Sequence, residues 1–347
     1  MKSGTWRMGG WSRPVRRYGC STATGQPVIC SGRKPSLGPR WGRIMWLMSF
    51  DAPPAPAIVE ITVAAPPTSA AFQTAFTPSA PSPTHGVVQR WSKSDPAQAY
   101  YLYVPPGVGG NAPVLVVVHG VSRNAEEQVR RFRRLARQYG VVLVAPRFPT
   151  DRFADYQRLG LTGQGERSDQ ALQAILTEVR HQTGITGRLY LFGYSGGGQF
   201  VHRYAMAHPE QVAAVAIGAA GWYTFPNPQV RFPCGLKISR RTGTRFRPER
   251  FLRIPMAVFV GEHDVRRGKD RPELRQTGRV DAQQGLTRLE RGDRWIDAMR
   301  AAARDRGLDT PYRYEILPHA AHSFAASMKR GGLGARVFDF LFGPPPT

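Results

Sequence analysis

Apolar residues are distributed differently before and after residue 85. Residues 1–50 mix Gly, Arg, Trp and Ser without a regular spacing, and residues 51–83 are rich in Pro, Ala, Ser and Thr. Neither stretch has the periodic apolar positions with which helices and strands cover a core, and such segments usually stay unfolded or act as linkers. We therefore expect a disordered, low-complexity segment over residues 1–84 and a folded domain over residues 85–347.

Within the folded domain, short apolar runs alternate with segments that have helical spacing. The run Val114–Val118 contains no polar residue, as is typical of a strand buried on both faces. Alternation of such strands with helices indicates a mainly parallel sheet covered by helices on both faces, which is an α/β fold. The first two strands are expected to be antiparallel and joined by a turn at residues 94–96. The predicted strands are 87–91, 100–104, 114–118, 141–145, 189–192, 212–217, 255–260 and 312–317.

Apolar residues that recur every three or four positions predict the helices between these strands. The first helix begins after Asn124, its expected N-cap, and buries Val129 and Phe132. Its five arginines, at positions 130, 131, 133, 134 and 137, are expected to face solvent. Further helices are predicted over 168–184, 199–207 and 286–306, with a closing helix that includes 337–342.

Basic residues exceed acidic ones throughout the chain. There are 48 Lys and Arg against 24 Asp and Glu, a formal net charge of +24, and residues 1–50 contain no acidic residue. Such an excess attracts phosphates and anionic lipids, but no motif of a known nucleic-acid reader accompanies it, so we expect no specific nucleic-acid partner. Residues 224–253, rich in Arg and Pro, are too long for an ordinary connection and predict a basic cap or lid.

Cysteine usage and apolar run lengths bear on the compartment. Three cysteines, Cys20, Cys30 and Cys234, form neither a disulfide framework nor a zinc-site spacing, which favours a reducing, cytoplasmic location. Arg16-Arg17 resembles the start of an export signal but lacks the apolar region that should follow, so export is the alternative. No apolar run reaches the roughly 18 residues of a transmembrane helix, and no metal or organic cofactor is expected.

The segment Gly193-Tyr194-Ser195-Gly196-Gly197 lies between the predicted strand 189–192 and the helix 199–207. This G-x-S-x-G spacing places a serine at a sharp turn from strand to helix, where glycine neighbours permit a strained backbone. The helix N-terminus behind the serine favours negative charge on a reacting oxygen. Ser195 is therefore the expected nucleophile, and the backbone N–H of Gly196 is one expected donor to an oxyanion.

Three other predicted strands end in residues that suit the same chemistry. His119 and Gly120 follow strand 114–118, where we expect the Val121 N–H to be the second oxyanion donor and His119 to shape the loop. Asp264 follows strand 255–260 and can orient an imidazole, with Glu262, His263 and Asp281 as rivals. We expect the base to be His322, on the loop before the closing helix, rather than His319.

These motifs resemble those of the α/β-hydrolase superfamily, over residues 86–342. The chain order Ser195, Asp264, His322 matches that superfamily and differs from the orders in chymotrypsin-like and subtilisin-like proteases. The run from Gly193 to Phe200 and the His-Gly loop are most similar to the esterase and polyhydroxybutyrate-depolymerase-like branch. The resemblance implies a serine esterase with Ser195 as nucleophile, His322 as base and Asp264 as the orienting acid.

Further residues predict how a substrate is bound. Its expected form is a small or polymeric ester, and the sequence does not predict an oligomeric state. Alternatives are a serine peptidase of the same fold and a non-catalytic, basic binding protein on a hydrolase scaffold. The arginines at positions 147, 152 and 158 are candidates for binding an anionic group, although solvation explains each of them as well. The predicted substrate-binding residues are Tyr194, Trp222, Tyr223 and Tyr156, with Phe148 and Phe225 as further candidates.

Overall fold

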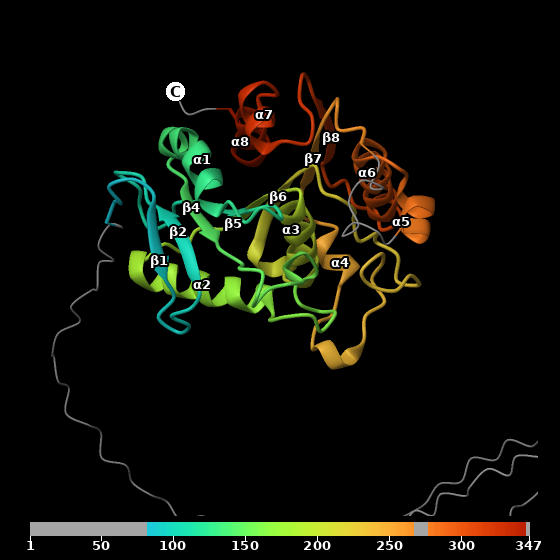
Figure 1. Cartoon of the computed structure of the whole chain (residues 1–347), viewed down its shortest axis with the longest axis horizontal. Helices are drawn as coiled ribbons and strands as arrows, with labels where there is room; N and C mark the ends of the chain where they lie inside the picture. Colours follow the sequence, from blue (N-terminus) through green and yellow to red (C-terminus); the bar gives the residue numbers. More distant parts are fainter. Residues whose placement is uncertain (1–81, 267–276, 345–347) are drawn as a thin grey trace, which may run out of the picture. The chain divides into compact units, whose positions relative to one another are not determined.

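The computed structural model describes residues 82–266 and 277–344, and the account below concerns these residues (Figure 1). Their strands form one sheet in the order β1-β2-β4-β3-β5-β6-β7-β8. The β1–β2 and β2–β4 pairs are antiparallel, and all other neighbours are parallel. The strands are β1 (Val88–Trp91), β2 (Ala99–Tyr103), β3 (Val114–Val118), β4 (Val142–Pro146), β5 (Leu189–Tyr194), β6 (Val212–Gly218), β7 (Met256–Gly261) and β8 (Tyr312–Leu317).

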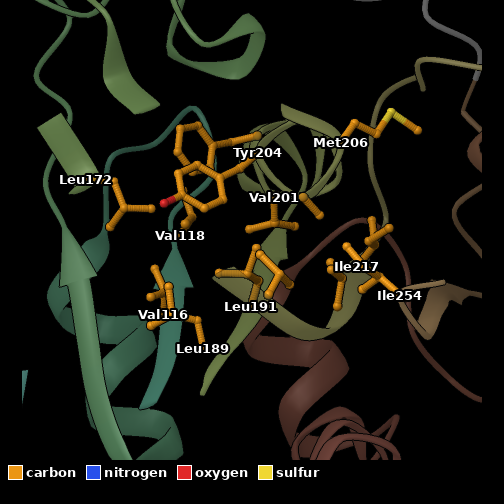
Figure 2. Packing of buried hydrophobic residues seen from close by; sticks show 14 of the residues in the cluster. Val116, Val118, Leu172, Leu189, Leu191, Val201, Tyr204, Met206, Ile217 and Ile254 are labelled. Carbon is orange, nitrogen blue, oxygen red and sulfur yellow. The ribbon is translucent and has the colours of Figure 1, made fainter. Parts of the chain in front are cut away.

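Helices cover both faces of the sheet, as the alternating pattern predicts (Figure 1). On β3, Val116 and Val118 pack with the side chains of α2 and α3, whereas Leu115 and Val117 pack with those of α1 and α8. Figure 2 shows the first of these layers, where Val116 of β3 lies near Leu191 of β5. The helices are α1 (Ala125–Tyr139), α2 (Ser168–Thr183), α3 (Gly196–Ala207), α4 (Pro248–Phe251), α5 (Thr277–Gln284), α6 (Arg288–Arg304), α7 (Phe324–Lys329) and α8 (Leu333–Phe342).

The predicted strands agree with the structure to within two residues at either end, and the five arginines of α1 are exposed. Two helix predictions need correction. The helix predicted to begin at residue 199 begins at Gly196, whereas the helix predicted over 286–306 is confirmed as α6 to within two residues at either end. The helices α4 and α5 were not predicted. Asn124 occupies the N-cap position of α1, but its side chain accepts no hydrogen bond from the backbone of the first helical turn. Its amide Nδ2 donates to the Glu127 carboxylate instead (2.7 Å). The helix α7 was not predicted.

The predicted cap segment, 224–253, is anchored to the helices behind the sheet. The Thr224 hydroxyl accepts a hydrogen bond from Arg203 of α3 (2.9 Å) and donates to the Pro233 carbonyl (2.6 Å). The indole N–H of Trp295 in α6 donates to the Thr224 carbonyl (2.8 Å). A cap function for this segment stays a prediction. Among the described residues, no helix is both long and apolar enough to cross a membrane.

Candidate active site

Ser195 lies at the turn where β5 ends and α3 begins. Its φ of 55° and ψ of −111° are strained for a residue with a side chain. A Cβ on Gly197 would collide with the Val118 carbonyl of β3, and one on Gly193 would collide with the Gly197 carbonyl. The close approach of β3, β5 and α3 therefore requires glycine at both positions, which explains the G-x-S-x-G spacing.

Side chains from three different loops meet at this turn. The Ser195 Oγ lies 3.0 Å from Nε2 of His322, and Nδ1 of His322 lies 2.7 Å from Oδ2 of Asp264. The Asp264 side chain is fully buried. With Nδ1–H donating to that carboxylate, Nε2 is left to accept the serine proton, so the two hydrogen bonds form one continuous chain. The structure thus brings together the three residues that the sequence predicts for catalysis.

Parallel strands explain why these residues meet. The strands β5, β7 and β8 all end at the same edge of the sheet, and their following loops carry Ser195, Asp264 and His322. The two last loops are tied together, because the His263 N–H donates to the Ala320 carbonyl (2.9 Å). The three functional side chains are therefore brought together by the shared edge at which their parallel strands end, although they are far apart in the sequence.

The rivals of Asp264 and His322 lie outside this hydrogen-bonded chain. Glu262 accepts from the backbone N–H of His319 (2.8 Å) and lies 2.9 Å from the His263 ring. The His319 and His263 side chains are largely exposed. Asp281 pairs with Arg291 of α6 (2.6 Å). These residues stabilise the surrounding loops and do not contact Ser195.

The residue that pairs with the Asp264 carboxylate was not predicted from the sequence. Arg288, the first residue of α6, donates from Nη1 to Oδ1 of Asp264 (3.0 Å) and lines the cleft beside Ser195. Its side chain is only 10% exposed, so the guanidinium offsets the charge of a buried carboxylate. A cation is unfavourable in the first turn of a helix because of the macrodipole. The position of a cation directly after the capping Thr287 was the only feature of the sequence that could have indicated a role for Arg288.

His119 holds the loop after β3 in place, as predicted. Its Nδ1–H donates to the Gly120 carbonyl (2.8 Å), and its Nε2 accepts from the Phe148 N–H (3.0 Å). Burial away from solvent is the main reason that its pKa falls to about 4, so the ring is neutral at neutral pH. His119 therefore acts as a fixed support for the loop and cannot reach the hydrogen-bonded chain of Ser195.

The predicted oxyanion donors lie next to one another. A Cβ on Gly196 would come within 3.2 Å of Val121 Cγ1, and one on Gly120 would come within 3.5 Å of Ser195 Cβ. Within the described chain, neither the Val121 nor the Gly196 backbone N–H has a hydrogen-bond acceptor. Both donors are thus free for a ligand at the elbow, although their catalytic role stays a prediction.

Of the predicted substrate-binding residues, Tyr194 lies at the cleft. Its ring stacks on His322 with centroids 5.6 Å apart, and its hydroxyl lies 3.2 Å from that of Ser327. The structure places the other three in the interior. Tyr156 donates to the His119 carbonyl (3.0 Å), Trp222 packs under the Arg203 guanidinium (4.4 Å) and Tyr223 stacks on Trp295 (4.8 Å). None of these three lines the cleft at Ser195.

Three of the other aromatic and basic candidates also have structural partners. Phe148 is buried in a cluster with Phe153 and Phe200. Arg152 pairs with Asp95 and Glu166, and Arg158 pairs with Asp155. The cleft beside Ser195, about 280 Å³ in volume, is lined by the apolar residues Val121, Phe324 and Ala325. It is also lined by polar residues for which the sequence predicted no substrate contact: Ser122, Asn124, Glu127, Gln128, Gln199, Arg288 and Ser323.

No metal-binding cluster accompanies this site in the described residues, where no three His, Cys, Asp or Glu side chains are grouped to hold an ion. A larger hollow of about 510 Å³ lies beside Arg167 and His208 and contains no member of the Ser195 site.

Comparisons with known proteins agree with this architecture. A family model described as Esterase PHB depolymerase matches residues 98–242. The structure of LpqC, a poly(3-hydroxybutyrate) depolymerase from Bordetella parapertussis, is 25% identical, and the match covers 77% of this chain and 92% of LpqC with a TM-score of 0.59. Poly(aspartic acid) hydrolase-1 from Sphingomonas sp. KT-1 is 22% identical over 76% of this chain and 99% of its own, also with a TM-score of 0.59, and shows the shared fold.

Curated relatives match over shorter stretches. A fluoroacetate dehalogenase of a Burkholderia species is 28% identical over 116 residues, which are 32% of this chain and 35% of the dehalogenase. This chain therefore spans about a third of that relative. A bifunctional acetylxylan esterase and xylanase from Neocallimastix patriciarum is 28% identical over 122 residues, 17% of its length.

Sheet order, elbow and strand-end loops together make this chain an α/β-hydrolase, as the sequence predicts. Within that superfamily it is similar to the esterases of PHB-depolymerase type, because the family model covers β3, the elbow and the strands between them.

Proposed function

We propose that this chain hydrolyses a carboxylic ester by nucleophilic catalysis at Ser195. The observation that carries the proposal is the continuous hydrogen-bonded chain from the Ser195 hydroxyl through His322 to the buried Asp264. A serine hydroxyl is a weak nucleophile at neutral pH and needs an adjacent, oriented base. The elbow supplies the exposed hydroxyl, and the two hydrogen bonds supply the base in the required orientation.

The reaction proceeds through an acyl-enzyme. As Ser195 Oγ attacks the ester carbonyl carbon, His322 Nε2 takes the hydroxyl proton, and the resulting imidazolium is stabilised by Asp264. The tetrahedral intermediate collapses, and the leaving alcohol takes the proton from His322. A water molecule then gives a proton to His322 as it attacks the acyl carbon and forms a second tetrahedral intermediate. When the bond from the acyl carbon to Ser195 Oγ breaks, His322 returns that proton to Oγ, and the carboxylic acid is released from the regenerated serine.

Two backbone donors stabilise the negative charge that develops on the carbonyl oxygen. The Val121 and Gly196 N–H groups lie beside the elbow without acceptors, and a donor of this kind is worth about 3 kcal/mol of barrier. Val121 is held by the loop that His119 supports. Arg288 acts through Asp264, whose carboxylate it holds in position by a hydrogen bond to Oδ1.

Covalent labelling tests this function directly. A fluorophosphonate probe should label the wild-type chain, and peptide mapping should find the label on Ser195. Ser195→Ala should abolish labelling and lower the hydrolysis of 4-nitrophenyl esters about 10⁴-fold or more, whereas Ser239→Ala, at an exposed serine remote from the cleft, should change neither. A peptidase would also turn over the matched 4-nitroanilides, which an esterase would leave almost unchanged, and a binding protein would show neither label nor turnover.

A further inference from the structure

Two buried glutamines line the cleft beside Ser195, and each has an amide atom that forms no hydrogen bond within the described chain. Gln128 of α1 is 1% exposed, and its Oε1 has no hydrogen-bond partner. Gln199 of α3 is 3% exposed; its Oε1 accepts from Nη1 of Arg203 (3.4 Å), and no group of the described chain accepts from its Nε2. A buried amide without a partner costs free energy, so a ligand that completes its hydrogen bonds is bound preferentially.

The side chains next to Gln128 indicate the charge of a ligand that would bind there. One turn before it, Asn124 has an unpaired Oδ1, while its Nδ2 donates to Oε2 of Glu127 (2.7 Å). Glu127 is also paired with Arg131 (2.8 Å) and lines the cleft. A carboxylate at this end repels an anionic substrate group, and the two unpaired oxygens of Gln128 and Asn124 require a hydrogen-bond donor.

Gln199 adds the complementary requirement. Its Oε1 is held by Arg203, so its Nε2 remains to donate to a ligand. A hydroxyl is the smallest neutral group that can donate to Gln128 and accept from Gln199 through a single atom. The interior of a polyester, whose repeating unit carries only ester oxygens, offers no donor for Gln128. The small volume of the cleft, about 280 Å³, suits a short substrate.

We infer that the cleft is a specificity site for short esters that carry a free hydroxyl near the scissile bond, with Gln128 and Gln199 as the residues that recognise the hydroxyl. This inference rests on the ester hydrolysis proposed above. It assigns to the two glutamines a role in substrate choice and none in the chemical step.

Two pairs of esters of nearly equal shape test the inference. On the acyl side, 4-nitrophenyl 3-hydroxypropanoate is compared with 4-nitrophenyl butyrate, which has a methyl group in place of the hydroxyl. On the alcohol side, 2-hydroxyethyl butyrate is compared with propyl butyrate. In at least one pair, wild-type kcat/KM should favour the hydroxylated ester by about 10-fold, the effect of one well-placed hydrogen bond.

Gln128→Met retains the length of the side chain but removes its hydrogen bonds, so the ratio within the favoured pair should fall to about 1–2. Gln138→Met makes the same change at an exposed position of α1 and should keep the wild-type ratio. If Gln128→Met is poorly folded by circular dichroism, Gln199→Met serves as the second variant and should lose the preference in the same pair.

The outcomes separate the two proposals. A wild-type ratio near 1 in both pairs would overturn the inference, and so would a preference that survives both glutamine substitutions while Ser195 still reacts with fluorophosphonate. Absence of both ester turnover and labelling would instead refute the esterase chemistry, and the inference with it.

Discussion

Acidification should destabilise this chain through His119, because the folded protein keeps that imidazole neutral. The ring is fully buried, and its pKa falls from the ordinary value of 6.5 to about 4. Its Nε2 accepts the Phe148 N–H and cannot do so once protonated. His119 is therefore protonated near pH 6.5 in the unfolded chain but only near pH 4 in the folded chain. The free energy of unfolding falls as the pH is lowered from 6.5 to 4.

The magnitude follows from the two titration points. One pKa unit corresponds to about 1.4 kcal/mol, so the contribution of His119 to the free energy of unfolding should fall by roughly 2 kcal/mol from pH 7 to pH 5, and by about 3 kcal/mol at pH 4. Above pH 6.5 the contribution is fully present. His202, also buried and with a lowered pKa, should act in the same direction.

A comparison of variants isolates this effect from the titration of carboxylates. His119→Gln offers Phe148 an amide oxygen in place of Nε2 but cannot titrate, and His181→Gln makes the same change at an exposed histidine. Urea unfolding, followed by circular dichroism between pH 7.5 and 4, should show wild type losing about 3 kcal/mol relative to His119→Gln. His181→Gln should follow the wild-type curve. Parallel curves for wild type and His119→Gln would refute the argument.

Three further expectations concern the site and the limits of the domain. His322→Ala should remove nearly all ester turnover while His319→Ala keeps most of it, as measured with 4-nitrophenyl butyrate; the reverse order would make His319 the base. Arg288→Gln should cost roughly 3 kcal/mol of stability in thermal or urea unfolding, because it removes the cation that pairs with the buried Asp264. Arg288→Lys, which keeps the charge, should restore part of that stability, and equal stabilities of wild type and Arg288→Gln would exclude a stabilising role for the ion pair. A variant that lacks residues 1–81 should keep the wild-type kcat/KM, and an inactive, insoluble product would show that this segment is needed for folding.

Local signals in the sequence determined the fold and the three residues of the hydrogen-bonded chain. The run Val114–Val118 identified a strand buried on both faces, and the structure confirms its bounds. The glycines around Ser195 predicted the elbow, because only glycine fits where β3, β5 and α3 approach each other. Asp264 and His322 could be selected because each follows a predicted strand, and parallel strand ends share one edge of a sheet.

The immediate surroundings of those residues were decided only by the tertiary structure. Arg288 follows Asp264 by 24 positions and reaches it because the start of α6 lies beside the loop after β7. Tyr156 and Tyr223 are aromatic residues near strand ends, as the sequence showed, but they are buried with no face on the cleft. Gln128 lies at a helical position with no chemical signature, and its lack of a partner exists only in the folded chain. The backbone strain at the elbow and the apolar runs of buried strands are encoded by residues that are neighbours in the sequence. The burial and pairing of a side chain depend instead on which distant elements pack against it. For that reason the sequence identified the reacting groups, and only the tertiary structure identified the groups around them.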